Sequence, residues 1–160
     1  MLLLLLALAS APQGDFVRGA EPQVTVVKTN DGISKAIAAN KGSVTIVKFW
    51  ATWCDPCVEE FPHFLEIVRA FPDAKVVSVS VDLRQGIDSH VKPFLKAHNV
   101  EFPTLLLDVD DPAVVMKKIN KKWDGTLPAT FIYGRDGKLA KTFIGPAKTL
   151  KAAVEEALKP

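Results

Sequence analysis

The 160-residue sequence predicts an α/β fold in which a central β-sheet is flanked by helices. From Gln23 onward, short β-branched and aromatic segments alternate with segments whose apolar residues recur at helical spacing. The two cysteines of the chain stand at one junction between such a strand and such a helix. Towards the carboxyl end, two strand-like segments flank Gly134-Arg135-Asp136-Gly137, which indicates a hairpin.

The first half of this pattern contains the elements around the cysteines. Alternation over 24–28 predicts a short strand, and Asp31 can cap a following helix that ends at Asn40-Lys41-Gly42. Residues 44–50 have the composition of a buried strand, and residues 58–68 have helical spacing. A second buried strand is expected over 74–81.

The second half adds elements before and after the hairpin. Residues 88–98 are amphipathic and predict a helix, and the apolar run 104–107 favours a short strand. Pro112 suits the first turn of another helix. The hairpin strands are expected over 129–133 and 139–144, followed by a last helix from about 147 to 158.

Length and charge limit the possible functions. A chain of this size suits one domain with one core. The net charge of +2 is too small to argue for binding to nucleic acid or to an anionic membrane surface. The lysine-rich run at 117–122 indicates the solvated face of a helix, or a docking surface for an acidic partner. We expect a monomer.

The amino-terminal residues are typical of a secretory signal peptide. A leucine-rich run leads to Ala9-Ser10-Ala11, so residues 1–11 would be cleaved near Ala11, although no Lys or Arg precedes the leucines. The run is shorter than the roughly 20 residues of a membrane-spanning helix. Residues 12–22 predict a linker and 23–160 the folded domain. We expect an extracytoplasmic protein of the bacterial periplasm; the alternative is an apolar element of the fold itself.

The segment Trp53-Cys54-Asp55-Pro56-Cys57 indicates the chemistry. Cys54 falls near a helix N-terminus, where the helix dipole and unpaired N–H groups stabilise the thiolate that attacks disulfides. Cys57 lies one turn further along. A zinc site needs about four ligands, and the histidines do not have the required spacing. A structural disulfide across so short a loop would stabilise little. The pattern predicts dithiol redox chemistry without a metal or other cofactor.

Beyond these residues, 23–159 resemble the thioredoxin superfamily. The likeness rests on Phe49 to Cys57, on Glu60-Phe61-Pro62 and on Leu127-Pro128-Ala129-Thr130-Phe131. With the extra helix and apolar segment after Val81, it is most similar to the TlpA/ResA-type extracytoplasmic thiol-disulfide oxidoreductases. The resemblance implies a thioredoxin-like fold: a central mixed sheet flanked by helices, with a strand and helix inserted before the cis-proline strand.

The resemblance also implies roles for individual residues. Cys54 would be the attacking thiol, Cys57 the buried resolving thiol, and Pro128 the cis-proline beside which a substrate chain can pair. Glu60 matches a glutamate that tunes thiol acidity in ResA-like proteins; a solvated acid of the first helical turn is the alternative. The residues expected to contact substrate are Trp53, Asp55, Pro56 and Leu127.

One position departs from the thioredoxin pattern. Thioredoxins have a buried aspartate six residues before the first cysteine, which relays protons for the resolving thiol; here this position is Lys48. The proton would then pass through Glu60, water or the substrate. An ammonium directed at the site would favour a thiolate.

The residue after the first cysteine bears on the direction of electron flow. Asp55 places a negative charge beside Cys54, which disfavours the thiolate and predicts a reducing or intermediate potential. A reductant in an oxidising compartment needs an electron source. The expected partners are therefore a membrane donor of thiol electrons and protein disulfide substrates such as apocytochrome c or metal-site thiols.

Two other functions are weaker alternatives. A peroxiredoxin-type thiol peroxidase needs Pro and Thr upstream of the reactive cysteine, where this chain has Val47 and Ala51. A copper-binding module on the same fold needs a matched distal ligand, and Met116 and His98 do not form a convincing pair.

Overall fold

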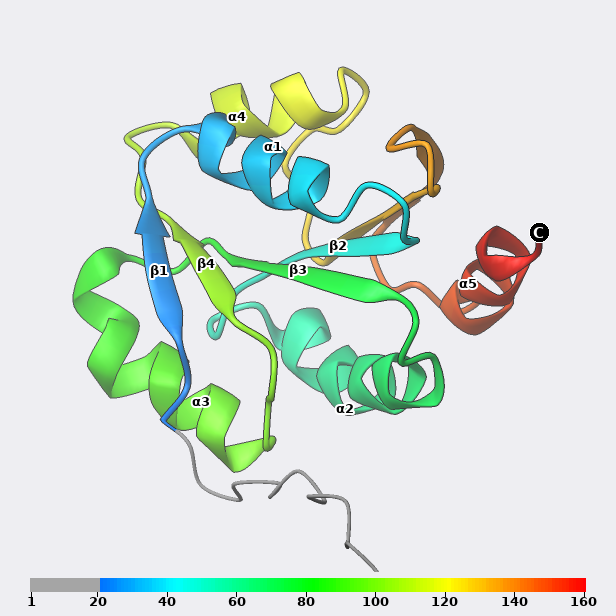
Figure 1. The fold of residues 1–160 in the computed structure, drawn as a ribbon. Helices are drawn as coiled ribbons and strands as arrows, with labels where there is room; N and C mark the ends of the chain where they lie inside the picture. The colour runs from blue at the N-terminus through cyan, green and yellow to red at the C-terminus, as the bar shows by residue number, and fades with distance from the viewer. Residues whose placement is uncertain (1–20) are drawn as a thin grey trace, which may run out of the picture.

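The computed structural model describes residues 21–160, which form one sheet with helices on both of its faces (Figure 1). The predicted signal peptide at 1–11 and the predicted linker at 12–22, except for Glu21 and Pro22, lie outside the described residues. Within 21–160, no helix has both the length and the apolar composition needed to cross a bilayer.

The sheet has six strands in the order β1-β4-β3-β2-β5-β6. Strands β1 to β4 run parallel to one another, whereas β5 is antiparallel to both β2 and β6, so the sheet is mixed as predicted. The inserted run at 104–107 is a true strand and lies between β1 and β3. The strands are β1 (Val24–Val27), β2 (Thr45–Trp50), β3 (Lys75–Ser80), β4 (Thr104–Leu107), β5 (Ala129–Tyr133) and β6 (Leu139–Ile144).

The helices form a layer on each side of the sheet. In Figure 1, α1 and α4 cover the upper face, and α2 and α3 cover the lower face, with α5 beside them at the β5–β6 end. Two short helical turns, Arg84–Gly86 and Ile87–Val91, lead directly into α3. The helices are α1 (Asn30–Ala39), α2 (Asp55–Ala70), α3 (Lys92–Ala97), α4 (Pro112–Ile119) and α5 (Leu150–Leu158).

Strand β2 separates two apolar clusters because all of its residues are buried. Successive side chains of a strand point to opposite faces, so Ile46 and Trp50 pack under α2 while Val47 and Phe49 pack under α1 and α4. On the second side, Trp123 lies edge-on to Phe49 with ring centroids 4.7 Å apart. The site described below is built on the first side.

Several sequence-based expectations need correction. The side chain that caps α1 is Thr29, which accepts a hydrogen bond from the amide of Asp31, so Asp31 is a first-turn residue and not the cap. Helix α2 begins before Cys57, at Asp55, and α5 begins at Leu150, not at about 147. His98 is half-buried against Phe94.

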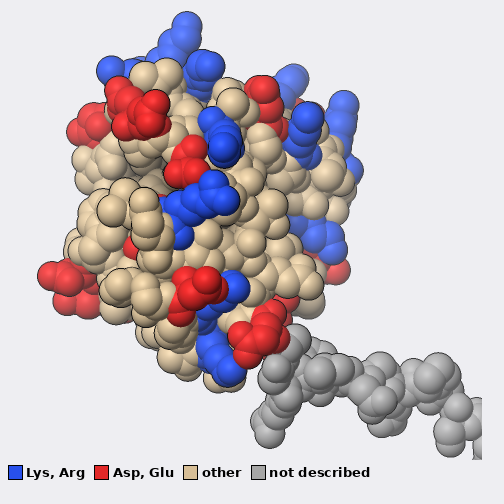
Figure 2. Space-filling model, turned by 90° about the vertical axis from the view of Figure 1, so that its left-hand side faces the viewer, with Lys and Arg blue, Asp and Glu red and all other residues tan. Residues whose placement is uncertain are grey.

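Charged side chains of both signs are scattered over the edge of the molecule around β1 and α3. Figure 2 shows Lys and Arg interspersed with Asp and Glu on this face. One of the contacts here joins Lys96 of α3 to Glu21 at 2.7 Å, so the chain just before β1 is tied to the helix layer.

Candidate active site

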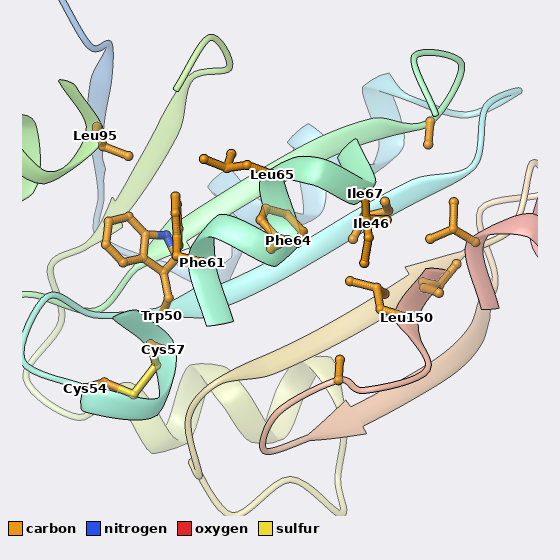
Figure 3. Close-up of a cluster of buried hydrophobic side chains, with 14 of the residues drawn as sticks. Ile46, Trp50, Cys54, Cys57, Phe61, Phe64, Leu65, Ile67, Leu95 and Leu150 are labelled. Atoms are coloured by element: carbon orange, nitrogen blue, oxygen red, sulfur yellow. A yellow bond between two sulfur atoms is a disulfide. The ribbon is translucent and has the colours of Figure 1, made fainter. Parts of the chain in front are cut away.

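The cysteines lie where β2 ends and α2 begins. Cys54 is the N-cap of α2, and Asp55 and Pro56 occupy the first turn, where a proline loses no helical hydrogen bond. The two sulfurs form a disulfide, with the Cα atoms of Cys54 and Cys57 5.2 Å apart (Figure 3). Cys57 is completely buried, whereas Cys54 is 6% exposed. The cysteine at the helix terminus is therefore the more exposed of the two.

A buried carboxylate braces the loop that leads to the cysteines. Asp82, directly after β3, accepts hydrogen bonds from the Thr52 amide, at 3.1 and 3.2 Å to its two oxygens, and from the hydroxyls of Thr52 and Ser80. These bonds fix the chain immediately before Trp53. Asp82 is not among the site residues predicted from the sequence. The available signal was its place after a buried strand, at the sheet edge from which the cysteine loop also leaves.

The residues predicted to contact substrate lie partly at the surface. Trp53 is 64% exposed, an unusual state for a large aromatic side chain, and Asp55 and Pro56 are also exposed. Leu127 is half-buried. An apolar side chain in solvent beside a disulfide offers a contact surface for a polypeptide.

The Leu127–Pro128 peptide bond is cis, as expected. Pro128 is buried and directly precedes β5, whose first residue, Ala129, pairs with Phe49 near the end of β2. This register brings Pro128 to the same edge of the sheet as the cysteine loop. Its carbonyl accepts a hydrogen bond of 2.8 Å from the amide of Gly145, so the residue directly after β6 also holds it in place.

Glu60 lies in a buried ion pair with Lys48. The Lys48 Nζ is 2.6 Å from Glu60 Oε2, and the other Glu60 oxygen accepts a hydrogen bond from the Ala147 amide. Lys48 is completely buried on β2, and the Glu60 side chain is only 9% exposed. The alternative in which Glu60 is a solvated acid is therefore wrong, although it describes the exposed Glu59.

The electrostatics of Lys48 follow from its surroundings. Burial lowers the pKa of the Lys48 ammonium, and the Glu60 carboxylate partly offsets this effect. The ammonium also lies 5.0 Å from the centroid of the Phe64 ring, a cation–π distance. It is thus directed at the inner face of α2, and its partner Glu60 is one helical turn beyond Cys57.

The structure separates the residues of the copper-site alternative. Met116 is buried in the cluster under α4, while His98 stacks on Phe94 on the opposite side of the sheet. Among residues 21–160, no three His, Cys, Asp or Glu side chains gather as ligands for one metal ion. Val47 and Ala51 are both buried apolar side chains.

Comparisons with known proteins agree with this arrangement. Residues 19–142 match the AhpC/TSA family. The chain is 36% identical over 150 residues to the sporulation thiol-disulfide oxidoreductase A of Bacillus subtilis (strain 168), covering 91% of this chain and 87% of that protein. It is 29% identical over 128 residues to the thiol-disulfide oxidoreductase ResA of the same organism, covering 79% and 67%.

A solved structure shares the fold. The thiol:disulfide interchange protein of the thioredoxin family from Chlorobium tepidum TLS superposes with a TM-score of 0.62 at 24% identity, over 88% of this chain and 99% of that one. The fold is thus thioredoxin-like, and the curated relatives are thiol-disulfide oxidoreductases. Together with the disulfide at the start of α2, these matches show that the chain belongs to the AhpC/TSA family and is a ResA-like thiol-disulfide oxidoreductase.

Proposed function

We propose that this oxidoreductase reduces disulfide bonds of exported proteins, with Cys54 as the nucleophile and Cys57 as the resolving thiol. One observation carries the proposal: Cys54 is the N-cap of α2 and the more exposed of the two cysteines, while Cys57 is fully buried one turn further in. Unpaired N–H groups at the helix N-terminus favour the thiolate of the outer cysteine.

The proposed cycle starts from the dithiol. The Cys54 thiolate attacks one sulfur of the substrate disulfide, forms a mixed disulfide and releases the other substrate sulfur, which takes up a proton. Cys57 then loses its proton and attacks the Cys54 sulfur. The Cys54–Cys57 bond forms, and the second substrate thiol leaves. Two electrons have passed from the protein to the substrate.

Reduction is the favoured direction because Asp55 stands next to the nucleophile. Its exposed carboxylate disfavours a neighbouring thiolate, and a dithiol without unusual thiolate stabilisation is a weak oxidant. Substrates would be exported proteins such as apocytochrome c or proteins with metal-site thiols. A membrane donor of thiol electrons would restore the dithiol, and the signal-like residues 1–11 support a location outside the cytoplasm.

Substrate contacts are proposed for the residues around Cys54. Trp53 would pack against the substrate chain, with Pro56 and Leu127 as apolar neighbours and Asp55 as a charged one. The Trp53 side chain has the exposed area for this contact, and the loop that holds it is braced by Asp82.

Trapping of mixed disulfides tests the assignment. Cys57→Ser should accumulate covalent complexes with partner proteins, since the bond to Cys54 is no longer broken from inside the protein. Cys54→Ser is the matched control and should accumulate none. Both variants are compared on non-reducing gels after expression in an exporting host. Equal trapping by the two variants would show that Cys54 is not the nucleophile.

A further inference from the structure

The Lys48–Glu60 pair is unusual because it places two charges between strand β2 and helix α2, the helix that begins at the disulfide. Strand neighbours of Lys48 on the same face, Ile46 and Trp50, are apolar and fully buried. Burying an ammonium is unfavourable unless it is paired and hydrogen-bonded. Lys48 meets this requirement through Glu60, and Glu60 is held from its other side by the Ala147 amide.

The pair is also close to the buried cysteine. Glu60 and Cys57 are three residues apart on α2, and residues at this spacing lie on one face of a helix with Cβ atoms about 5–6 Å apart. Cys57 and Phe64, the ring beneath the Lys48 ammonium, belong to the same apolar cluster. A charge change in the pair would therefore reach the Cys57 sulfur across a medium of low dielectric constant.

We propose that Lys48 is a positioning residue of the redox site, which acts through Glu60. Its ammonium fixes the Glu60 carboxylate and cancels its charge, so that the Cys57 thiol can lose its proton without a lone negative charge beside it. This inference rests on the proposed function, because it takes Cys57 as the resolving thiol. It assigns to Lys48 a part in the step that frees the substrate.

The step itself is the second half of the proposed cycle. The Cys57 thiol gives up its proton, and its sulfur attacks the Cys54 sulfur of the mixed disulfide. The Cys54–Cys57 bond forms, the bond between Cys54 and the substrate breaks, and the departing substrate thiolate takes up a proton. The proton that Cys57 releases to water is matched by the proton that the departing substrate thiolate takes up, and Lys48 and Glu60 keep their charges, so the balance needs no further reagent.

Other charged groups around the pair are exposed or engaged elsewhere. On α2, Asp55 and Glu59 are exposed. Next to Ala147, Lys148 is exposed. From the sheet, the neighbours of Lys48 in register are the hydroxyl residues Ser78 on β3 and Thr130 on β5.

Two further titratable groups belong to other contacts. Within 21–160, the buried charged residues are Lys48 and Asp82. Asp82 is hydrogen-bonded to Thr52 and Ser80. His98 is half-buried against Phe61 and Phe94, and its Nδ1 is hydrogen-bonded to the Phe94 carbonyl. On the buried side of α2, the charged residue nearest to Cys57 along the helix is therefore Glu60.

The test measures the Cys57 thiol alone, in a Cys54→Ser background, by its thiolate ultraviolet absorbance as a function of pH. Lys48→Met should raise the pKa of Cys57 by about one unit, so that about tenfold less thiolate is present at a given pH, because Glu60 then stands uncompensated. Lys48→Arg retains the cation and should keep the wild-type curve.

The double variant shows whether the effect passes through Glu60. Lys48→Met with Glu60→Gln removes both charges and should return the Cys57 pKa to near the wild-type value. The proposal would be overturned if the Cys57 pKa of the double variant stayed as high as that of Lys48→Met. It would also be overturned if Lys48→Met had the same Cys57 titration curve as the wild type. If Lys48→Met does not fold, Glu60→Gln alone serves: no carboxylate then stands beside Cys57, so the Cys57 pKa should equal or fall below the wild-type value, and a raised value contradicts the proposal.

Failure of this inference differs from failure of the proposed function. If Cys57→Ser traps partners but Lys48→Met leaves the Cys57 titration unchanged, the reductase assignment stands and Lys48 is only structural. If Cys57→Ser traps no partner, the assignment of the two thiols fails whatever Lys48 does.

Discussion

Lys48 is charged but sits on a strand whose every side chain is buried, so its protonation is linked to folding. Burial lowers the pKa of the ammonium in the folded state, and Glu60 restores part of the loss. In the unfolded chain the side chain is hydrated and titrates at its ordinary value of 10.5. The folded protein therefore releases this proton at a lower pH than the unfolded chain does.

The linkage predicts the sign of a pH effect. At pH values between the lowered Lys48 pKa of the folded protein and 10.5, Lys48 binds more protons in the unfolded chain than in the folded protein. The contribution of Lys48 to the free energy of unfolding therefore rises with pH in this range. The test is to measure the free energy of unfolding by urea, from pH 8 to 10.5, for the oxidised protein and for Lys48→Met. Because both proteins contain the same other lysines, the difference between them isolates the contribution of Lys48. The free energy of unfolding of the wild type minus that of the variant should increase with pH. A constant or falling difference would mean that burial does not depress the Lys48 pKa.

At the scale of elements, the sequence predicts most of the architecture because period and composition are local signals. Both ends of each strand lie within one residue of the predicted bounds for three strands, the one predicted over 44–50 and the two hairpin strands predicted over 129–133 and 139–144. Helix starts are less accurate, since several residues near one start can serve as the cap. At α1 both Thr29 and Asp31 are suitable types, and only the backbone geometry selects Thr29, which is extended while Asp31 is already helical.

The site was predicted only in part for a similar reason. Cys54, Cys57 and Pro128 belong to contiguous motifs, so the sequence alone identifies them. The partner of Glu60 is 12 residues away on another element, and its contact depends on how β2 packs against α2. Asp82 is 30 residues from Thr52, and Trp123 reaches Phe49 from an irregular segment. Contacts of this kind are set by tertiary packing: a local pattern can place such a residue at the end of a strand, as for Asp82, but it does not identify the residue's partner.

The cap of α1 gives a prediction at this scale. Thr29→Ala removes the side-chain acceptor for the Asp31 amide and should lower the free energy of unfolding by about 1 kcal/mol, as measured by urea denaturation. Asp31→Ala is the matched control: it leaves this bond in place, loses only a favourable charge near the helix N-terminus, and should cost about 0.3–1 kcal/mol. A larger loss from Asp31→Ala would make Asp31 the effective cap.

At the scale of the whole molecule, the redox state of one bond is coupled to global stability. A disulfide between Cys54 and Cys57 closes a ring over a sequence separation of 3, and the loop-closure relation assigns such a ring about 2 kcal/mol of stabilisation. Oxidants of this class owe their potential to an unusually stable reduced form. The difference in unfolding free energy between the two states thus reports the direction of electron flow.

We expect the oxidised protein to be more stable than the reduced protein, by up to about 2 kcal/mol, because Asp55 opposes the stabilisation that the helix N-terminus gives to a thiolate at Cys54. Urea unfolding with and without a thiol reductant measures the difference, and a Cys54→Ala, Cys57→Ala double variant should be insensitive to the reductant. The equilibrium potential, titrated through Trp53 fluorescence, should then lie towards about −270 mV rather than −120 mV. A reduced form more stable than the oxidised form would assign the protein to the oxidants and reverse the proposed direction of electron flow.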